Sequence, residues 1–437
     1  MSEAQPERTD LEEVWPDLSP EERIAAFRKL PRGEAAEFFL QRSARTQALI
    51  LADATEAERR VLLRTLAPDD AADLLQEMEP EERAAALALL DASTTREVRA
   101  LLAYAEDEAG GLMNPRFVRL RPDMTVDEAI RYARMQSRDR AETINYLYVL
   151  DAEQRLLGML SFRDLFAAPG GARVSDVMLR DVVTVDEHAD QEEVARQIAS
   201  LDVVALPVVD GQGRMVGIVT IDDVVDVVRE EATEDIQKIG GMEALEAPYL
   251  YTSFFSLLRK RAPWLVLLFG GQALTIAAMG AFQAELAGAI VLAFFIPLVI
   301  SSGGNSGSQA STLVIRAMAL GEVRLRDWWR VARRELAMGA SLGALLAAVG
   351  AAGVLAWDAA FDAYGPHAII LAATLSLSVL GVVTWGTLTG STLPFLLRRV
   401  GFDPASASAP LVATLVDVAG VLIYFSIARH VYLAAVG

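Results

Sequence analysis

One carboxylate stands inside a long apolar stretch of this sequence. Asp417 lies in the run PLVATLVDVAGVLIYF (410–425), whose other residues are apolar, small or hydroxyl-bearing. An ionisable side chain at the depth of a membrane is costly, so it normally faces a bundle interior or a watery path, and its default interpretation is functional. The alternative is a protonated or hydrogen-bonded Asp that only joins two helices. The pattern favours a carboxylate that faces an ion path.

A second polar segment interrupts another apolar stretch. The run FFIPLVI (294–300) is followed directly by SSGGNSGSQ (301–309). Exposed to lipid, this segment would be costly, but small residues downstream of a proline permit either close helix packing or a broken helix whose carbonyls line a cavity. Both interpretations stay open for this segment alone. A membrane-embedded Asp elsewhere in the chain favours the cavity.

Five apolar stretches are long enough to cross a membrane. Lys and Arg occur before the first stretch, after the second and after the fourth, whereas the other two connections have none. By the positive-inside rule, this pattern predicts a cytoplasmic N-terminus and a C-terminus on the outside. No signal sequence opens the chain, which agrees with a cytoplasmic N-terminus. The stretches lie near 263–283, 286–315, 336–357, 367–396 and 408–428.

Charge is distributed unevenly along the chain. Residues 1–258 carry 51 acidic and 28 basic side chains, whereas residues 259–437 carry 8 acidic and 12 basic ones. The strong negative charge of residues 1–258 favours cations as partners and disfavours nucleic acid. Cysteine is absent and the three histidines are scattered, so thiolate and imidazole metal sites are not expected. We find no P-loop and no nucleophile motif, and we therefore do not expect an enzyme.

Residues 1–112 contain a repeated helix-start pattern. The segments LSPEERIAAF (18–27), LAPDDAADLL (66–75) and MEPEERAAAL (78–87) each place a proline before two acids. Proline at the first helical position, with acids in the first turn, is typical of a helix N-terminus. The pattern predicts a small domain of stacked helices.

Residues 113–235 contain an internal duplication. The segments 146–165 and 205–224 align without a gap at an offset of 59. Each predicts a strand, a polar turn, a second strand and a helix that is opened by Ser161 or Thr220, with Asp164 or Asp223 at the third helical position. This arrangement resembles the tandem CBS (cystathionine-β-synthase-type) module, which implies an adenine-nucleotide site. The same residues could equally be helix caps. The candidate nucleotide-binding residues are Arg163, Asp164, Thr220 and Asp223.

An acidic segment connects the duplication to the first apolar stretch. Residues 222–241 place several carboxylates at helical spacings of three and four, where they repel one another unless a cation neutralises them. Because this segment leads directly into the first apolar stretch, a cation or other ligand that binds these acids can affect the membrane domain.

The order of these parts resembles the MgtE family of magnesium channels and transporters, and the resemblance covers essentially the whole chain. The segments GGNSGSQASTLVIRA (303–317) and DPASASAPLVATLVDVAG (403–420) are similar to its two pore segments. The resemblance implies a homodimer in a bacterial plasma membrane, with one Mg²⁺ path between the two membrane domains. It implies pore positions at Asp417, Gly304, Asn305, Ser308, Thr312 and Ala413. It implies regulatory Mg²⁺ ligands at Asp69, Asp73, Asp202, Asp223, Asp226, Glu231, Glu234, Asp235 and Asp403. Ser308 and Ala409 depart from the asparagines expected there, which leaves selectivity among Mg²⁺, Mn²⁺, Co²⁺ and Ni²⁺ open.

The expected fold is multidomain: a helical-repeat N-domain, an α+β CBS pair and a five-helix membrane domain. The expected boundaries are 1–112 for the N-domain, 113–229 for the CBS pair, 230–258 for the acidic connecting helix and linker, and 259–437 for the pore. We expect import of hydrated Mg²⁺ down its electrochemical gradient, closed by cytoplasmic Mg²⁺, with ATP as a possible ligand of the CBS pair. The alternatives are a proton-coupled carrier and a non-conducting membrane sensor of Mg²⁺ or nucleotide.

Overall fold

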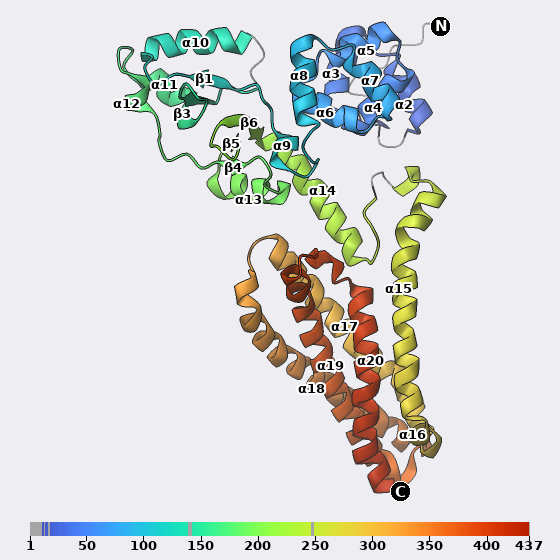
Figure 1. The fold of residues 1–437 in the computed structure, drawn as a ribbon. Coiled ribbons are helices and arrows are strands. Elements are labelled where there is room, and N and C mark those ends of the chain that lie inside the picture. The colour runs from blue at the N-terminus through green and yellow to red at the C-terminus, as the bar shows by residue number, and fades with distance from the viewer. Residues whose placement is uncertain (1–10, 13, 16–17, 139–141, 246–248, 437) are drawn as a thin grey trace. The chain divides into compact units, whose positions relative to one another are not determined.

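A computed structural model describes residues 11–12, 14–15, 18–138, 142–245 and 249–436 of the chain (Figure 1). The chain divides into two compact units, Met1–Arg229 and Glu230–Gly437. The helical N-domain, the two small sheets and the five long apolar helices agree with the predicted fold class.

The first unit begins with short helices whose starts follow the predicted proline pattern. Ser19 accepts a hydrogen bond from the Glu22 backbone N–H, and the Ser19 N–H donates to Glu22 Oε2, so the two residues form a capping box. Pro68 and Pro80 stand at the start of two further helices, which have acids in the first turn but no side-chain cap. The helices are α2 (Pro20–Phe27), α3 (Arg32–Leu40), α4 (Ala44–Asp53), α5 (Glu56–Leu63), α6 (Pro68–Gln76), α7 (Pro80–Leu87), α8 (Ala92–Leu101) and α9 (Ala109–Leu112).

Two three-stranded sheets follow, and they have the same topology. In each sheet the first strand runs parallel to the second and the second antiparallel to the third. Val149 pairs with Gly158 in one sheet and Val208 with Gly217 in the other, so the register repeats at the offset of the duplication. The strands are β1 (Val118–Leu120), β2 (Tyr146–Leu150), β3 (Leu156–Ser161), β4 (Val185–Asp186), β5 (Ala205–Val209) and β6 (Met215–Thr220). The helices of this part are α10 (Val126–Arg138), α11 (Phe162–Ala167), α12 (Val174–Val177), α13 (Gln191–Leu201) and α14 (Ile221–Ile239).

The second unit contains five helices that are long and apolar enough to cross a membrane, in agreement with the predicted number. The helix Trp328–Phe361 is longer than the stretch 336–357 that predicted it, whereas the helix Val291–Ala319 begins later than the stretch 286–315, because a separate short helix, Gln283–Gly288, covers the start of that stretch. Helix α19 packs against α17, α18 and α20 and forms the centre of the bundle. The helices are α15 (Phe254–Ala281), the short α16 (Gln283–Gly288), α17 (Val291–Ala319), α18 (Trp328–Phe361), α19 (Ala368–Arg399) and α20 (Ala409–Ala428), followed by α21 (Ala434–Val436).

Helix α17 is continuous through its polar segment, with Pro297 inside it, so the broken-helix interpretation is wrong. Two of its glycines serve close packing instead. A side chain at Gly386 of α19 would collide with the Gly303 carbonyl, and one at Gly390 would collide with the Gly307 carbonyl. Small residues allow the backbones of α17 and α19 to approach one another. Close packing against α19 therefore explains Gly303 and Gly307. It does not explain Gly304, which faces α20.

Candidate metal-ion sites

Asp417 lies near the middle of α20 and has a hydrogen-bond partner from the first long helix. Gln272 of α15 donates from Nε2 to Asp417 Oδ2 at 2.8 Å. This neutral amide satisfies one acceptor position of the carboxylate and brings no opposite charge to it. The prediction from the sequence missed Gln272, although a glutamine within an apolar stretch is a visible signal.

The two predicted pore segments lie against each other in the bundle. Gly304 and Ser308 stand four residues apart on α17, and Ala409 and Ala413 stand four apart on α20, so each pair lies on one helix face. A side-chain carbon at Gly304 would lie 3.6 Å from Ala413 Cβ. Ser308 Oγ donates to the Ala409 carbonyl at 3.3 Å. Since Asp417 follows Ala413 by four residues, small and hydroxyl-bearing positions of α17 and α20 adjoin the face of the carboxylate.

Asn305 and Thr312 do not point into the core of this single bundle. Both are exposed, and Thr312 Oγ1 donates to the Ser308 carbonyl of its own helix at 2.9 Å. The Asn305 side chain makes no hydrogen bond to any residue in the described ranges. A polar amide on the outside of a membrane helix is costly in lipid, so this face calls for water or another protein surface.

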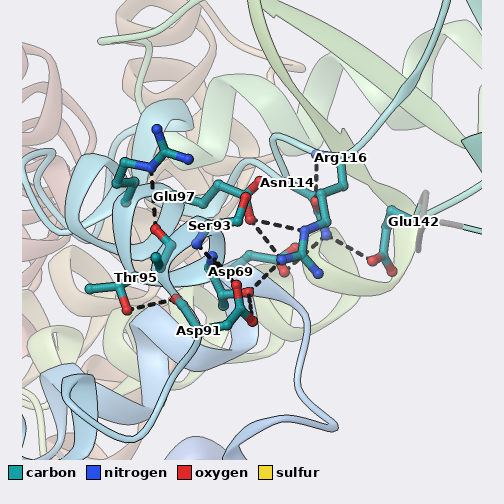
Figure 2. Close-up of polar contacts among 11 residues, drawn as sticks. Asp69, Asp91, Ser93, Thr95, Glu97, Asn114, Arg116 and Glu142 are labelled. Atoms are coloured by element: carbon teal, nitrogen blue, oxygen red, sulfur yellow. Dashed lines mark hydrogen bonds and ion pairs between the residues drawn. The ribbon is translucent and has the colours of Figure 1, made fainter.

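In the first unit, α6 buries a carboxylate beside other acids. Asp69 is 6% exposed and accepts a hydrogen bond from Asn114 Nδ2 at 3.0 Å. Asn114 also donates to Glu142 Oε2 at 2.7 Å, so one amide group joins two carboxylates (Figure 2). Burial, and then the charge of Asp223, raises the pKa of Asp69 well above its ordinary value.

Arg116 fixes the orientation of the Asn114 amide. The Arg116 backbone N–H donates to Asn114 Oδ1 at 2.8 Å, so both amide hydrogens are left for the carboxylates. The Arg116 guanidinium pairs with Glu97 at 2.7 Å, which holds this residue in place (Figure 2). No motif marked Asn114 in the sequence, because its role depends on residues 45 and 28 positions away.

The first turn of α14 adds its acids to the same neighbourhood. Asp223 accepts a hydrogen bond from Thr220 Oγ1 at 2.8 Å. Burial raises the pKa of Asp223 to about 7 despite this hydrogen bond, and the charges of Asp222 and Asp70 add to the rise. Burial, and then the charges of Asp222 and Asp226, raise the pKa of Asp70 of α6. We call Asp69, Asp70, Glu142, Asp222, Asp223 and Asp226 the first acidic cluster.

Two other predicted regulatory ligands have different surroundings. Asp73 is exposed on α6, one turn after the buried Asp69. Asp202 is exposed and ends α13 in the left-handed conformation, with φ of 53°, which Asp tolerates better than most residues. Within the described residues, no hydrogen bond or ion pair joins Asp202 to the first acidic cluster. Its part in metal binding stays a prediction.

In the second unit, Lys238 pairs with two of the four remaining predicted acids. Lys238 Nζ lies 2.6 Å from Asp403 Oδ2 and also pairs with Glu234. Burial, followed by the charges of Asp403 and Glu231, raises the pKa of Asp235 to about 6. Asp403 also accepts from the Ala405 N–H at 2.8 Å. This second acidic cluster, Glu231, Glu234, Asp235 and Asp403, therefore contains a cation from the chain itself, which the prediction of a purely repulsive segment did not include.

Within the described ranges, no three or more His, Asp or Glu side chains come together as a direct metal site. Mg²⁺ usually keeps several of its waters and binds through one or two carboxylates. Both acidic clusters are consequently better suited to a hydrated cation than to a fully dehydrated one.

The candidate nucleotide residues act as helix caps. Ser161 Oγ accepts from the Asp164 N–H at 3.0 Å and donates to Asp164 Oδ2 at 2.6 Å, and Thr220 makes the equivalent side-chain contact with Asp223. Arg163 is exposed beside the first cap. The capping interpretation is confirmed, and nucleotide binding stays a prediction because a capped helix start also accepts phosphate.

An apolar five-helix bundle with a lone deep carboxylate, joined to two strand-strand-helix repeats and an acidic helical domain, defines a class of ion transport protein with regulatory domains. Comparison with known proteins agrees. Residues 296–427 match the MgtE family, described as a divalent cation transporter, residues 7–107 match the MgtE intracellular N domain, and residues 109–171 and 174–230 match the CBS domain.

The chain is 43% identical over 423 residues to the magnesium transporter MgtE of Thermus thermophilus, covering 96% of this chain and 92% of that one. It is 31% identical to the magnesium transporter MgtE of Bacillus subtilis, covering 96% and 93%. A crystal structure of the cytosolic domain of the Mg²⁺ channel MgtE in complex with ATP is 45% identical and covers 51% of this chain and 91% of that one, with a TM-score of 0.48. The chain belongs to the MgtE family of transporters, which is not a family of enzymes.

Proposed function

We propose that this chain imports hydrated Mg²⁺ through a path lined by Asp417. The observation that carries the proposal is the position of Asp417. It stands on α20, the Gln272 amide brings no opposite charge to it, and it adjoins the small and hydroxyl-bearing face of α17. The names of two relatives that match nearly the whole chain support magnesium as the ion.

A hydrated ion suits the chemistry of this face. One carboxylate per chain with hydroxyls and small residues is a weak site for removing the waters of Mg²⁺, which dehydrates reluctantly. The same groups can hydrogen-bond to those waters. An inside-negative membrane potential drives entry by roughly 2.3 kcal/mol per charge per 100 mV. The positions Gly304, Asn305, Ser308, Thr312 and Ala413 would line this path.

The path is proposed to lie between two copies of the chain, with the C-terminus outside the cell. The exposed Asn305 and Thr312 support a second copy, because their polar groups would otherwise face lipid. Ser308 stands where family resemblance leads us to expect an asparagine, and it uses its hydroxyl within the bundle. Selectivity among Mg²⁺, Mn²⁺, Co²⁺ and Ni²⁺ is therefore a separate question from transport.

Regulation would come from cytoplasmic Mg²⁺ bound at the two acidic clusters. Mg²⁺ favours the closed path only if it binds the closed form more tightly. Asp223, whose pKa is raised to about 7, would release its bound proton as the ion binds. In the second cluster the ion would compete with Lys238 for Glu234 and Asp403. An adenine nucleotide at Arg163 and Asp164 or at Thr220 and Asp223 would tune this affinity.

The test is Mg²⁺ flux into liposomes, with wild type and Asp417→Asn compared in the presence and absence of a pH gradient. We expect wild-type flux to ignore the pH gradient and to fall at least about tenfold in the variant, since weakening the hydrogen bonds that a carboxylate makes to the waters of the ion costs on the order of 1.5 kcal/mol or more. Glu285→Gln is the control, because Glu285 lies in the short α16 beside Arg429. Flux that follows the pH gradient would favour the proton-coupled carrier, and normal flux through Asp417→Asn would contradict the proposed path.

A further inference from the structure

The second unit contains a cavity of about 210 Å³ at the cytoplasmic end of α15. One wall is a stripe of α15 at helical spacing, Leu257, Arg261 and Leu265. The other wall is the end of α14 and the chain after it, including Gln237 and Met242. A drug-sized ligand needs roughly 300–1,000 Å³, so this cavity suits one end of a longer molecule.

The walls of this cavity are held by specific contacts. The Glu243 N–H donates to the Lys260 carbonyl at 3.2 Å, and Lys260 Nζ donates to the Ala244 carbonyl. Gly241, with φ of 75°, packs so closely on the Trp264 ring that a side-chain carbon there would lie 2.7 Å from it. Trp264 Nε1 donates in turn to Ser408 Oγ at 3.2 Å. The position of the cavity walls is therefore fixed by backbone and side-chain contacts.

Arg261 is the charged member of the described cavity lining, and its guanidinium makes no ion pair or hydrogen bond within the described ranges. The remaining lining is largely apolar. The turn that leads into α15 exposes large apolar side chains, with Leu250, Phe254 and Phe255 at 85%, 72% and 79% exposure. Aromatic side chains at the end of a membrane helix typically sit at the level of the lipid headgroups.

We propose that this cavity binds an anionic phospholipid, with the lipid phosphate against Arg261 and the adjoining glycerol and acyl carbons against Leu257 and Leu265. Basic pockets at the cytoplasmic ends of membrane helices take such headgroups. The size of the cavity fits a ligand whose tails stay in the bilayer. A lipid here would brace the connection between α14 and α15. The proposal does not depend on ion transport, because binding can be measured without flux.

The test is native mass spectrometry of the full-length protein in detergent with phosphatidylglycerol or phosphatidylcholine. We expect wild type to retain phosphatidylglycerol preferentially, and Arg261→Gln to weaken this retention about fivefold. Arg259→Gln is the matched control, because Arg259 is exposed on the same turn but does not line the cavity. Equal losses in both variants would show diffuse attraction to a basic turn and would overturn the proposal.

A second variant tests the cavity itself. Leu257→Trp fills the space without changing charge, and we expect it to lose the retained phosphatidylglycerol while its size-exclusion profile and Mg²⁺ flux show a folded protein. Retention equal to wild type would overturn the cavity as the site. Glycerol phosphate in millimolar excess should leave the lipid in place. Displacement by glycerol phosphate would mean that the site takes a small soluble phosphate, and the lipid proposal would be wrong.

Discussion

The carboxylate in the membrane and the carboxylates of the first acidic cluster have different surroundings. Asp417 has a neutral amide, Gln272, as its partner. Asp69 also has an amide partner, Asn114, but Asp69 and Asp223 lie among other acids, and burial raises the pKa of both. The single membrane carboxylate is the one proposed to attract a passing cation, whereas the crowded carboxylates are those proposed to respond to a bound cation. Residues of the same type therefore differ here in how many acids surround them.

The largest expected effect concerns the partner of the membrane carboxylate. Gln272→Leu removes a hydrogen bond to a charged group, which is worth about 1.5–3 kcal/mol, so Mg²⁺ flux into liposomes should fall about tenfold. Gln283→Leu is the control, because Gln283 is exposed in the short α16. Undiminished flux through Gln272→Leu would mean that Asp417 needs no positioning partner, and the contrast between the two regions would then rest on charge crowding alone.

A smaller effect is expected at the second acidic cluster. Lys238→Met leaves Glu234 and Asp403 without their ammonium group. Without divalent cations, amide hydrogen exchange over 230–239 should speed up roughly fivefold, the size of a partly exposed ion pair of about 1 kcal/mol. Millimolar Mg²⁺ should restore the protection. Lys29→Met controls for the loss of one surface charge. Exchange that ignores both Lys238→Met and Mg²⁺ would remove this cluster from the proposed regulation.

The two copies of the duplication offer equivalent positions, Asp164 and Asp223, whose surroundings differ. Asp223 has a pKa raised to about 7, so the folded form loses stability as pH rises from about 4 towards 7 and stays penalised above that range. Asp223→Asn should therefore raise the melting temperature of the full-length protein at pH 8 in chelator by about 2–4 °C. The gain should shrink at pH 5, because wild-type Asp223 is then largely protonated.

The smallest expected effect is at the equivalent position of the first copy. Asp164 is exposed and contacts the cap residue Ser161, so Asp164→Asn should change the melting temperature little. The melting temperature of each variant is measured by circular dichroism, first without Mg²⁺ and then with it. Similar pH-dependent gains in both variants would show that the shared cap, and not the acidic surroundings of Asp223, sets the behaviour of these residues.

Much of this molecule could be predicted from local patterns in the sequence. The five spans follow from the length of apolar runs, the repeated sheets from the offset of 59, and the helix starts from proline and cap residues. Two acidic segments that carry the predicted regulatory ligands could also be located. These features could be predicted because they depend on neighbouring residues or on a repeated pattern.

The partners of the functional carboxylates were decided by tertiary structure alone. Gln272 meets Asp417 across 145 residues, Asn114 meets Asp69 across 45, and Lys238 meets Asp403 across 165. Nothing in the local spacing of these residues indicates the pairing, because it results from how whole helices pack. Packing also shows that Gly303 and Gly307 admit α19, while Gly304 faces α20. The sequence by itself determined which segments carry charge at unusual depth, and the fold decided which of those charges stand alone, which are crowded and which are already paired.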